Sequence, residues 1–359
     1  MSRHKCCFTD LKTIPEGTTY LEVTSSDSNG TGYRDLSGND YRKIPRSVET
    51  LSIDFVDFNG RKSHFPDWIT SLRVKSSWCE ELPVLPSGLR KLYVSANIRV
   101  LTGQFRDLEE IRLFNCPGLT VVGELPAVMK IIRIADCPCL VNWSFLPSLR
   151  VNRLELIEVK LPRAPATYPD EITALVIKRC KENGDVQPRL VTGHFTYKGK
   201  SSPRHSTPLS FSVSAKDMRL ASIRLGANAV PEGVESLTLT KCCWVQHVVL
   251  PQSLRSLTVK GDGSTSLGKL PENLESLRLK DMVYLRSYGG LPPFLHHIEI
   301  ENIYEPTDFP QLRHLQSAKI DYAVSTVVDP ETGDSRQVTF TDGNEYLAAL
   351  PQRIKSARF

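Results

Sequence analysis

The sequence predicts a β-rich solenoid, in which short repeated units stack to form one continuous core. Three copies of one phrase follow each other at an interval of twenty residues: VPEGVESLTL from Val230, LPQSLRSLTV from Leu250 and LPENLESLRL from Leu270. Each copy has a proline, an apolar residue three positions later, and aliphatic residues six and eight positions after the proline. The last two aliphatic residues alternate with period two, which predicts a short strand with one buried face.

The same pattern recurs from the N-terminus to the last residue, and we count about fifteen units. In chain order, the residue pairs predicted to point inward from the strands are Leu21 and Val23, Leu51 and Ile53, Leu72 and Val74, Leu92 and Val94, Ile111 and Leu113, Ile132 and Ile134, Leu154 and Leu156, Leu175 and Ile177, Ile223 and Leu225, Leu237 and Leu239, Leu257 and Val259, Leu277 and Leu279, Ile298 and Ile300, Ala318 and Ile320, and Ala357 and Phe359. The units therefore predict a single solenoid over 1–359.

Each unit also has a predictable side opposite its strand. Proline restricts the residue before it to extended conformations, so the approach to each strand should be extended. A period near twenty leaves little room for a full helix, and we expect extended or short 3₁₀ segments on the convex side. The stacked strands should form a parallel sheet on the concave side.

Three segments interrupt the period. Residues 24–43 are rich in Gly, Ser, Asn and Asp and predict a loop insertion. Residues 181–216 form the longest insertion, and 321–349 contain two β-branched runs around DPETGD, which predict a hairpin-like insertion before the last repeat. Insertions of this kind are either tolerated surface loops or binding segments.

Asn or Cys follows several strands at a constant position. This position holds Asn97 after LRKLYVSA, Cys116 after LEEIRLFN, Cys137 after MKIIRIAD, Cys180 after ITALVIKR and Cys242 after VESLTLTK. The pattern resembles the leucine-rich repeat family, which implies a horseshoe with a parallel concave sheet. The LP-x-x-L units resemble those of bacterial effectors, and FNCPGL and DCPCL resemble plant immune receptors. The resemblance implies that these cysteines point inward and hydrogen-bond the backbone.

Composition indicates a globular protein inside a cell. The chain has 359 residues, of which 40% are hydrophobic and 24% charged, with no apolar run long enough to cross a bilayer and no secretory leader. Nine cysteines, an odd number, favour thiols in a reducing compartment. We therefore expect a cytoplasmic location. The protein could act inside a host cell or belong to a virus particle.

No motif of catalytic quality is present, such as a phosphate-binding loop, a nucleophile elbow or H-E-x-x-H. The close cysteine pairs, for example Cys137 and Cys139, lie on turns too distant from each other to form a tetrahedral zinc site. We expect no enzyme activity, no cofactor and no metal.

The alternation predicts which side chains line the exposed face of the sheet. These positions carry basic residues in the middle of the chain: Arg73, Lys75, Lys91, Arg112, Arg133, Arg153, Lys178, Arg224, Lys260, Arg278 and Lys280. Only Glu110 and Glu155 oppose them there. The stripe is either an ordinary solvated strand face or a binding surface for a protein with an acidic surface. Few aromatic residues point outward, which disfavours nucleic acid.

The predicted function is that of a non-enzymatic protein–protein interaction scaffold, which binds through the concave face and the insertions, as an effector or immune-type module would. One alternative is a structural component of a large assembly such as a viral capsid, joined through exposed solenoid ends. Another is a substrate adaptor for a ubiquitin ligase on another chain.

Overall fold

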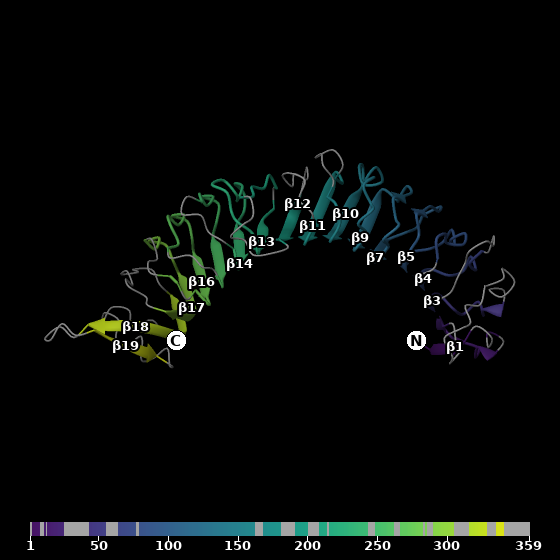
Figure 1. The fold of residues 1–359 in the computed structure, drawn as a ribbon, viewed down its shortest axis with the longest axis horizontal. Coiled ribbons are helices and arrows are strands. Elements are labelled where there is room, and N and C mark those ends of the chain that lie inside the picture. The colour runs from purple at the N-terminus through teal and green to yellow at the C-terminus, as the bar shows by residue number, and fades with distance from the viewer. Residues whose placement is uncertain are drawn as a thin grey trace. The chain divides into compact units, whose positions relative to one another are not determined.

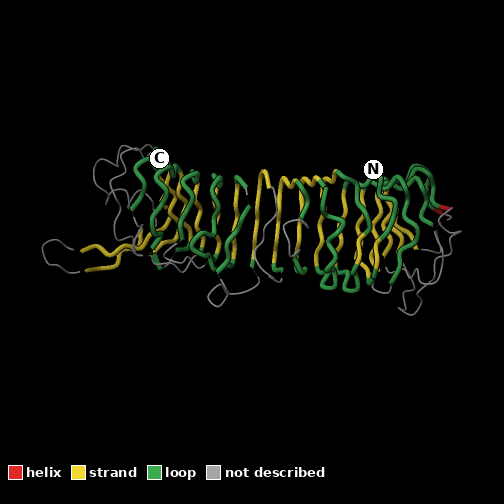
Figure 2. The backbone as a smooth tube through the Cα atoms, turned by 90° about the horizontal axis from the view of Figure 1, so that it is seen from above, coloured by secondary structure: helices red, strands yellow, loops and turns green. Residues whose placement is uncertain are grey.

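The computed structural model is a β-solenoid with a repeat of about 21 residues, a large parallel sheet and almost no helix. It describes residues 2–7, 11, 13–24, 43–54, 64–76, 79–161, 168–180, 191–199, 208–213, 215–242, 248–261, 266–282, 284–285, 290–304, 316–328 and 335–340. The chain divides into two compact units, unit 1 at Met1–Gly184 and unit 2 at Asp185–Phe359. Figure 2 shows strands and loops alternating along both units.

Unit 1 has one main parallel sheet (Figure 1). Its strands are β1 (Arg3–Cys7), β2 (Tyr20–Thr24), β3 (Thr50–Asp54), β4 (Ser71–Ser76), β5 (Lys91–Ala96), β7 (Glu110–Phe114), β9 (Val128–Ala135), β10 (Arg150–Ile157) and β11 (Glu171–Lys178). Each strand pairs in parallel with the next in this order. On another side of the coil, β6 (Val100–Leu101) pairs in parallel with β8 (Val121–Val122).

Unit 2 repeats this arrangement. Its strands are β12 (Val191–Lys198), β13 (Asp217–Ala221), β14 (Ser236–Thr240), β15 (Ser256–Lys260), β16 (Ser276–Lys280), β17 (His297–Tyr304) and β18 (Ser317–Val328), each parallel to the next. The three predicted copies are in register, since Leu237 pairs with Leu257 and Leu257 with Leu277. β18 then pairs antiparallel with β19 (Ser335–Phe340).

The core of each unit consists of the inward aliphatic residues of successive strands. Leu51, Leu72 and Leu92 stack in unit 1, Leu257 and Leu277 in unit 2, and all five side chains are 0% exposed. Burial of such side chains is the main favourable term in folding. Neighbouring turns bury the inner face of each strand, as expected for a solenoid.

The proline of each repeat starts a tight turn. The carbonyl oxygens of Pro66, Pro251 and Pro271 accept hydrogen bonds from the N–H groups three residues later, at 3.1–3.2 Å. The residues that donate, Ile69, Leu254 and Leu274, are fully buried. The P-x-x-Φ part of the phrase therefore forms the turn that places an apolar side chain in the core just before the strand.

The main sheets of the two units contain two strands that sequence analysis did not predict. β1 precedes the first predicted unit, and β12 lies within 181–216, which was interpreted as an insertion. The inward side chains of β12 are Phe195 and Tyr197, which pack against Phe211 with ring centroids 5.4 Å and 5.3 Å apart. This part of the predicted insertion is thus part of the stack.

The predicted register was wrong in one unit. Ile223 and Leu225 were expected to be the inward strand residues, but the strand there is β13, whose inward residues are Met218 and Leu220. The predicted loop at 24–43 and the last predicted unit, at Ala357 and Phe359, lie almost wholly outside the described residues. In the part of the chain that is described, no helix has the length and apolar content needed to cross a bilayer.

Candidate functional site

The side of each parallel sheet that faces away from the core is called here the outer face. It carries the side chains that alternate with the buried aliphatic residues. In unit 1 one row of paired residues runs from Arg73 on β4 through Tyr93 on β5 and Arg112 on β7 to Arg133 on β9. The strand register therefore brings three of the predicted basic residues into line.

All the predicted basic positions except one lie on strands at outer-face positions. Those in unit 1 are Arg73, Lys75, Lys91, Arg112, Arg133, Arg153 and Lys178, and those in unit 2 are Lys260, Arg278 and Lys280. Arg224 is the exception, because it follows β13 and sits between buried Ile223 and Leu225 on another side of the coil. The assignment of Arg224 to this face is corrected accordingly.

Two of the predicted basic residues of unit 1 lie over aromatic rings. The guanidinium carbon of Arg112 lies 5.3 Å from the ring centroid of Tyr93, and that of Arg133 lies 5.0 Å from the ring centroid of Phe114. Both distances are within the range of a cation–π interaction. We call Tyr93, Arg112, Phe114 and Arg133 the stacked cluster.

Two carboxylates hold these arginines. Glu110 and Glu155 are each only 7% exposed, although they lie on the sheet face. Glu110 pairs with Arg112, and Glu155 pairs with Arg133 at 3.1 Å and with Arg153 at 2.5 Å. Buried carboxylates are costly unless they are paired, so the carboxylates and the arginines fix one another in position.

Tyr93 is part of the same network. Burial, together with the charge of Glu110 and a hydrogen bond to it, raises the pKa of the Tyr93 hydroxyl above its usual value. The hydroxyl therefore stays protonated and donates to the Glu110 carboxylate. The Tyr93 side chain therefore contacts Arg112 through its ring and Glu110 through its hydroxyl.

The outer face of unit 1 has an excess of positive charge around the stacked cluster. Arg73 pairs in register with Tyr93, and Lys91 lies two residues before Tyr93 on the same face of β5, so both border the cluster. Both side chains are exposed, and neither forms a salt bridge within the described part of the chain. Their charges are therefore available to a partner.

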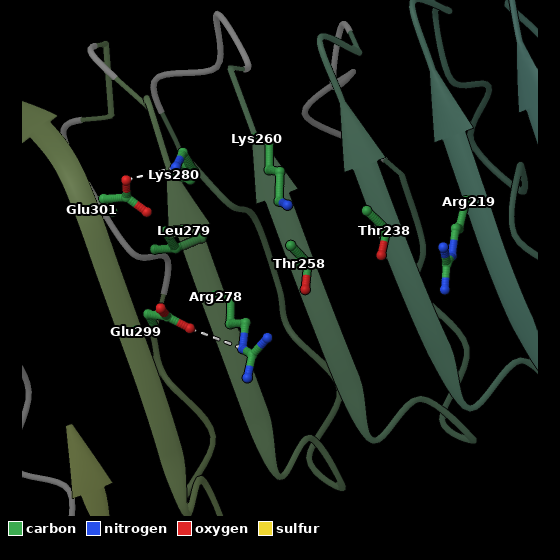
Figure 3. Close-up of a pocket in the computed structure, with 9 residues that line it drawn as sticks. All are labelled: Arg219, Thr238, Thr258, Lys260, Arg278, Leu279, Lys280, Glu299 and Glu301. Atoms are coloured by element: carbon green, nitrogen blue, oxygen red, sulfur yellow. Dashed lines mark hydrogen bonds and ion pairs between the residues drawn. The ribbon is translucent and has the colours of Figure 1, made fainter. Parts of the chain in front are cut away.

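In unit 2 the outer face contains a shallow depression of about 370 Å³. Its lining residues come from β13 to β17 and are labelled in Figure 3: Arg219, Thr238, Thr258, Lys260, Arg278, Leu279, Lys280, Glu299 and Glu301. The register places Thr238 and Thr258 side by side, between Arg219 and Arg278. We call this the β13–β17 depression.

Acidic neighbours hold the arginines at the sides of the depression. Arg278 Nε lies 3.0 Å from Glu299 Oε2, and Arg219 Nη2 lies 3.2 Å from Asp217 Oδ2. Lys280 Nζ lies 2.6 Å from Glu301 Oε1, and this hydrogen bond raises the pKa of Lys280. Lys260 is exposed and forms no salt bridge with any residue that the structure describes.

Sequence reasoning did not identify Arg219, Thr238 and Thr258 as lining residues of the β13–β17 depression. The wrong register at Ile223 hid Arg219, which lies between the inward residues Met218 and Leu220. An inward strand residue should lie about twenty residues before the corresponding residue of the next strand, and this rule identifies Met218, and therefore Arg219. Met218 pairs with Leu237, an offset of 19 residues, whereas Ile223 lies 14 residues before Leu237.

The cysteines after the strands are structural, as the repeat pattern implied. Cys116, Cys137, Cys180 and Cys242 are buried, and each thiol donates to the carbonyl two residues before it at 3.3–3.6 Å. Cys180 and Cys242 also reach the preceding strand, at Leu156 O and Leu220 O, both at 3.4 Å. These contacts satisfy buried carbonyl groups at the turn.

Comparisons with protein-family models, with curated proteins and with solved structures found no match.

Proposed function

We propose that the protein is a non-enzymatic interaction scaffold and that the outer face of unit 1 binds an acidic surface of a partner protein. The observation that carries the proposal is the stacked cluster, in which two arginines lie over aromatic rings and form ion pairs with the nearly buried carboxylates of Glu110 and Glu155. The resemblance of the repeats to leucine-rich repeats, including the Asn or Cys position, supports assignment to that family.

The composition of the cluster favours a protein partner. Arg and Tyr are the residues most enriched among those that dominate the energy of protein interfaces. Salt bridges and ring contacts already restrict Arg112 and Arg133, so binding would cost less side-chain entropy than for free arginines. A preordered cluster of this kind is suited to the centre of an interface.

The charge of the face favours an acidic partner. Arg73 and Lys91 border the cluster without salt bridges in the described part of the chain, and a negative surface would complement them. Charges at the edge of an interface accelerate association and lose their effect as salt is added. Binding should therefore weaken with ionic strength.

The test uses a fluorescein-labelled peptide of ten glutamates as the simplest acidic probe, with anisotropy as the measurement. Reversing both edge charges with Arg73→Glu and Lys91→Glu should weaken binding to the full chain by about tenfold or more. Neither substitution removes a salt bridge of the described residues, but a carboxylate at position 91 would lie opposite Glu110, so the variant should unfold at a lower temperature than the wild type, and thermal unfolding is measured to show that it is folded in the assay.

The matched control is Arg99→Glu with Arg106→Glu, which makes the same change in net charge on exposed turn residues of unit 1 that lie outside the main sheet. This control should bind the peptide as the wild type does, within about twofold. An equal loss in both double variants would show only a general effect of net charge and would contradict the proposed surface. Absence of binding to the wild type at low salt would contradict it as well.

A further inference from the structure

We propose that the β13–β17 depression of unit 2 is a second binding site, which recognises a phosphate monoester carried on a protein segment. The site is separate from the stacked cluster, and no part of the proposal depends on unit 1.

The strand register places several hydrogen-bond donors around Thr258. Thr258 and Lys260 project from the same face of β15, Arg278 projects from β16, and Thr238 lies on β14 (Figure 3). A lysine ammonium group has only donors, a guanidinium likewise, and each hydroxyl can donate one proton. Charged donors and hydroxyls together form the strong hydrogen bonds that an oxyanion accepts.

Carboxylates restrict Arg219 and Arg278 but leave part of each guanidinium available to an anion. Glu299 contacts Arg278 at Nε, which leaves the two terminal nitrogens of that guanidinium directed away from the carboxylate. Asp217 contacts Arg219 at Nη2, through the same oxygen that lies 2.9 Å from His194 Nδ1. Both carboxylates restrict the arginines from one side, and binding an anion on the other side would cost little additional side-chain entropy.

Lys260 supplies the uncompensated charge at the centre. It lies on the same row as Lys280, with which it pairs in register, but Lys280 is held by Glu301 at 2.6 Å. Lys260 has no such partner among the described residues, and its side chain extends toward Thr258 in Figure 3. An anion placed over Thr258 would therefore meet a full positive charge together with neutral donors.

The number of donors favours a phosphate monoester over a carboxylate. A phosphoserine or phosphothreonine carries about −1.5 to −2 charges and three acceptor oxygens, which can meet donors from several strands at once. A carboxylate has two oxygens in one plane, which suit a single bidentate arginine better. Recognition of phosphorylated segments by clusters of basic residues is a common mode of peptide binding.

The shape of the depression favours a group attached to a protein. Sites for free small molecules are concave and bury most of the ligand, whereas this depression is shallow and lined by the exposed face of a sheet. Its lining includes no aromatic residue. Since stacking on aromatic side chains is the usual way of holding single-stranded nucleic acid, the lining favours a phosphoprotein.

The test uses fluorescein-labelled degenerate peptides with a fixed central phosphoserine, compared by anisotropy with the same mixtures carrying serine or glutamate there. The phosphoserine mixture should bind the full chain about tenfold more tightly than the serine mixture, as expected for new charge-assisted hydrogen bonds. Lys260→Met and, separately, Thr258→Val should each reduce this preference by about fivefold or more.

The matched control is Lys216→Met, which removes the same charge from unit 2 but at an exposed lysine that pairs with Glu235 just before β14. Its preference for phosphoserine should equal that of the wild type. The Arg73→Glu and Lys91→Glu double variant should also keep the preference, so failure of the unit 1 surface and failure of this site can be told apart.

Three outcomes would overturn the inference. The first is equal binding of the phosphoserine and serine mixtures by the wild type. The second is retention of the preference in both Lys260→Met and Thr258→Val, with thermal unfolding showing that the variants are folded. The third is that a single-stranded RNA oligonucleotide binds more tightly than the phosphoserine mixture and that this binding depends on Lys260. That result would assign the depression to nucleic acid.

Discussion

At the scale of single residues, a glycine marks the closest approach between two turns of unit 2. Gly199 follows β12, and its N–H donates to Ala221 O at 2.9 Å. A Cβ atom built on Gly199 would lie 2.3 Å from the carbonyl oxygen of Ser222. A backbone atom cannot move aside as the end of a side chain can, so only glycine fits this position without a shift of the chain.

The substitution Gly199→Ala should therefore destabilise the protein. We expect the free energy of unfolding to fall by about 1–3 kcal/mol, the usual range for overpacking, as measured by denaturant unfolding. Gly88→Ala is the matched control, because its Cβ would meet no atom closer than 3.9 Å and its φ angle is not positive. The control should unfold at the same denaturant concentration as the wild type or at a slightly higher one. Equal losses in both variants would contradict the close-approach argument.

Residue-level prediction succeeded where strict alternation determines direction. Arg73, Arg112 and Arg278 were placed on the outer face because each stands between two inward aliphatic residues. The same rule could not show that Glu110 and Glu155 are buried, or that Arg112 and Arg133 lie on aromatic rings. Those facts depend on contacts between side chains on neighbouring strands, which a period of twenty residues does not specify.

At the scale of the repeated element, a left-handed residue directly follows eight of the strands. The residues with φ near +50° directly after a strand are Asn115, Asp136, Glu158, Arg179, Ser222, Lys241, Gly261 and Asp281. Their N–H groups bond to the next strand, for example Lys241 N to Lys260 O at 2.7 Å and Gly261 N to Lys280 O at 2.8 Å. The reversal in φ turns the following residue inward.

The residue after this turn points inward and is buried wherever the structure describes it. It is a cysteine at Cys116, Cys137, Cys180 and Cys242, and an aliphatic side chain or methionine at Val159, Ile223 and Met282. This explains the register error at β13, because Ile223 is buried as the residue after the turn and not as part of the strand. An apolar residue in this position imitates a strand residue in the sequence.

Replacing a left-handed lysine with glycine tests the role of the turn. Lys241 has a φ of 50° and is exposed, so Lys241→Gly should remove backbone strain of about 1–2 kcal/mol while adding about 0.5–1 kcal/mol of entropy cost. We expect the free energy of unfolding to stay constant or rise by up to about 1 kcal/mol.

The control for this prediction is Lys260→Gly, which makes the same chemical change inside β15, where φ is not positive. This variant should lose about 0.5–1 kcal/mol in the same denaturant experiment, because glycine weakens a strand. If both variants lose stability to a similar extent, the left-handed conformation of Lys241 carries no strain.

The strands that sequence analysis missed depart from the repeated phrase in their inward residues. β12 buries Phe195 and Tyr197 where most other strands bury aliphatic side chains, and the sequence has no proline six residues before Phe195. β1 has His4 and Cys6 at the corresponding positions, with Cys6 8% exposed. A search for leucine at fixed intervals finds neither strand, although both satisfy the same backbone pairing.

At the scale of the whole molecule, stability in a solenoid depends on contacts between neighbouring turns. Successive strands pair only with the strands before and after them in each unit, and the core consists of side chains stacked between those strands. Free energy in such a fold is approximately a sum of local terms. A defect in one turn should therefore open nearby turns before distant ones.

Leu257→Ala provides the decisive measurement of this locality. Leu257 is 0% exposed and stacks between Leu237 and Leu277, so the substitution should create a cavity and cost about 2–5 kcal/mol. Hydrogen exchange followed by mass spectrometry should show faster exchange in β14 to β16 and unchanged exchange in β3 to β5 of unit 1, whereas Ser256→Ala, on the outer face of the same strand, should change neither. Uniformly faster exchange throughout both units would mean that the chain unfolds as one cooperative body, because local terms alone cannot transmit the defect so far.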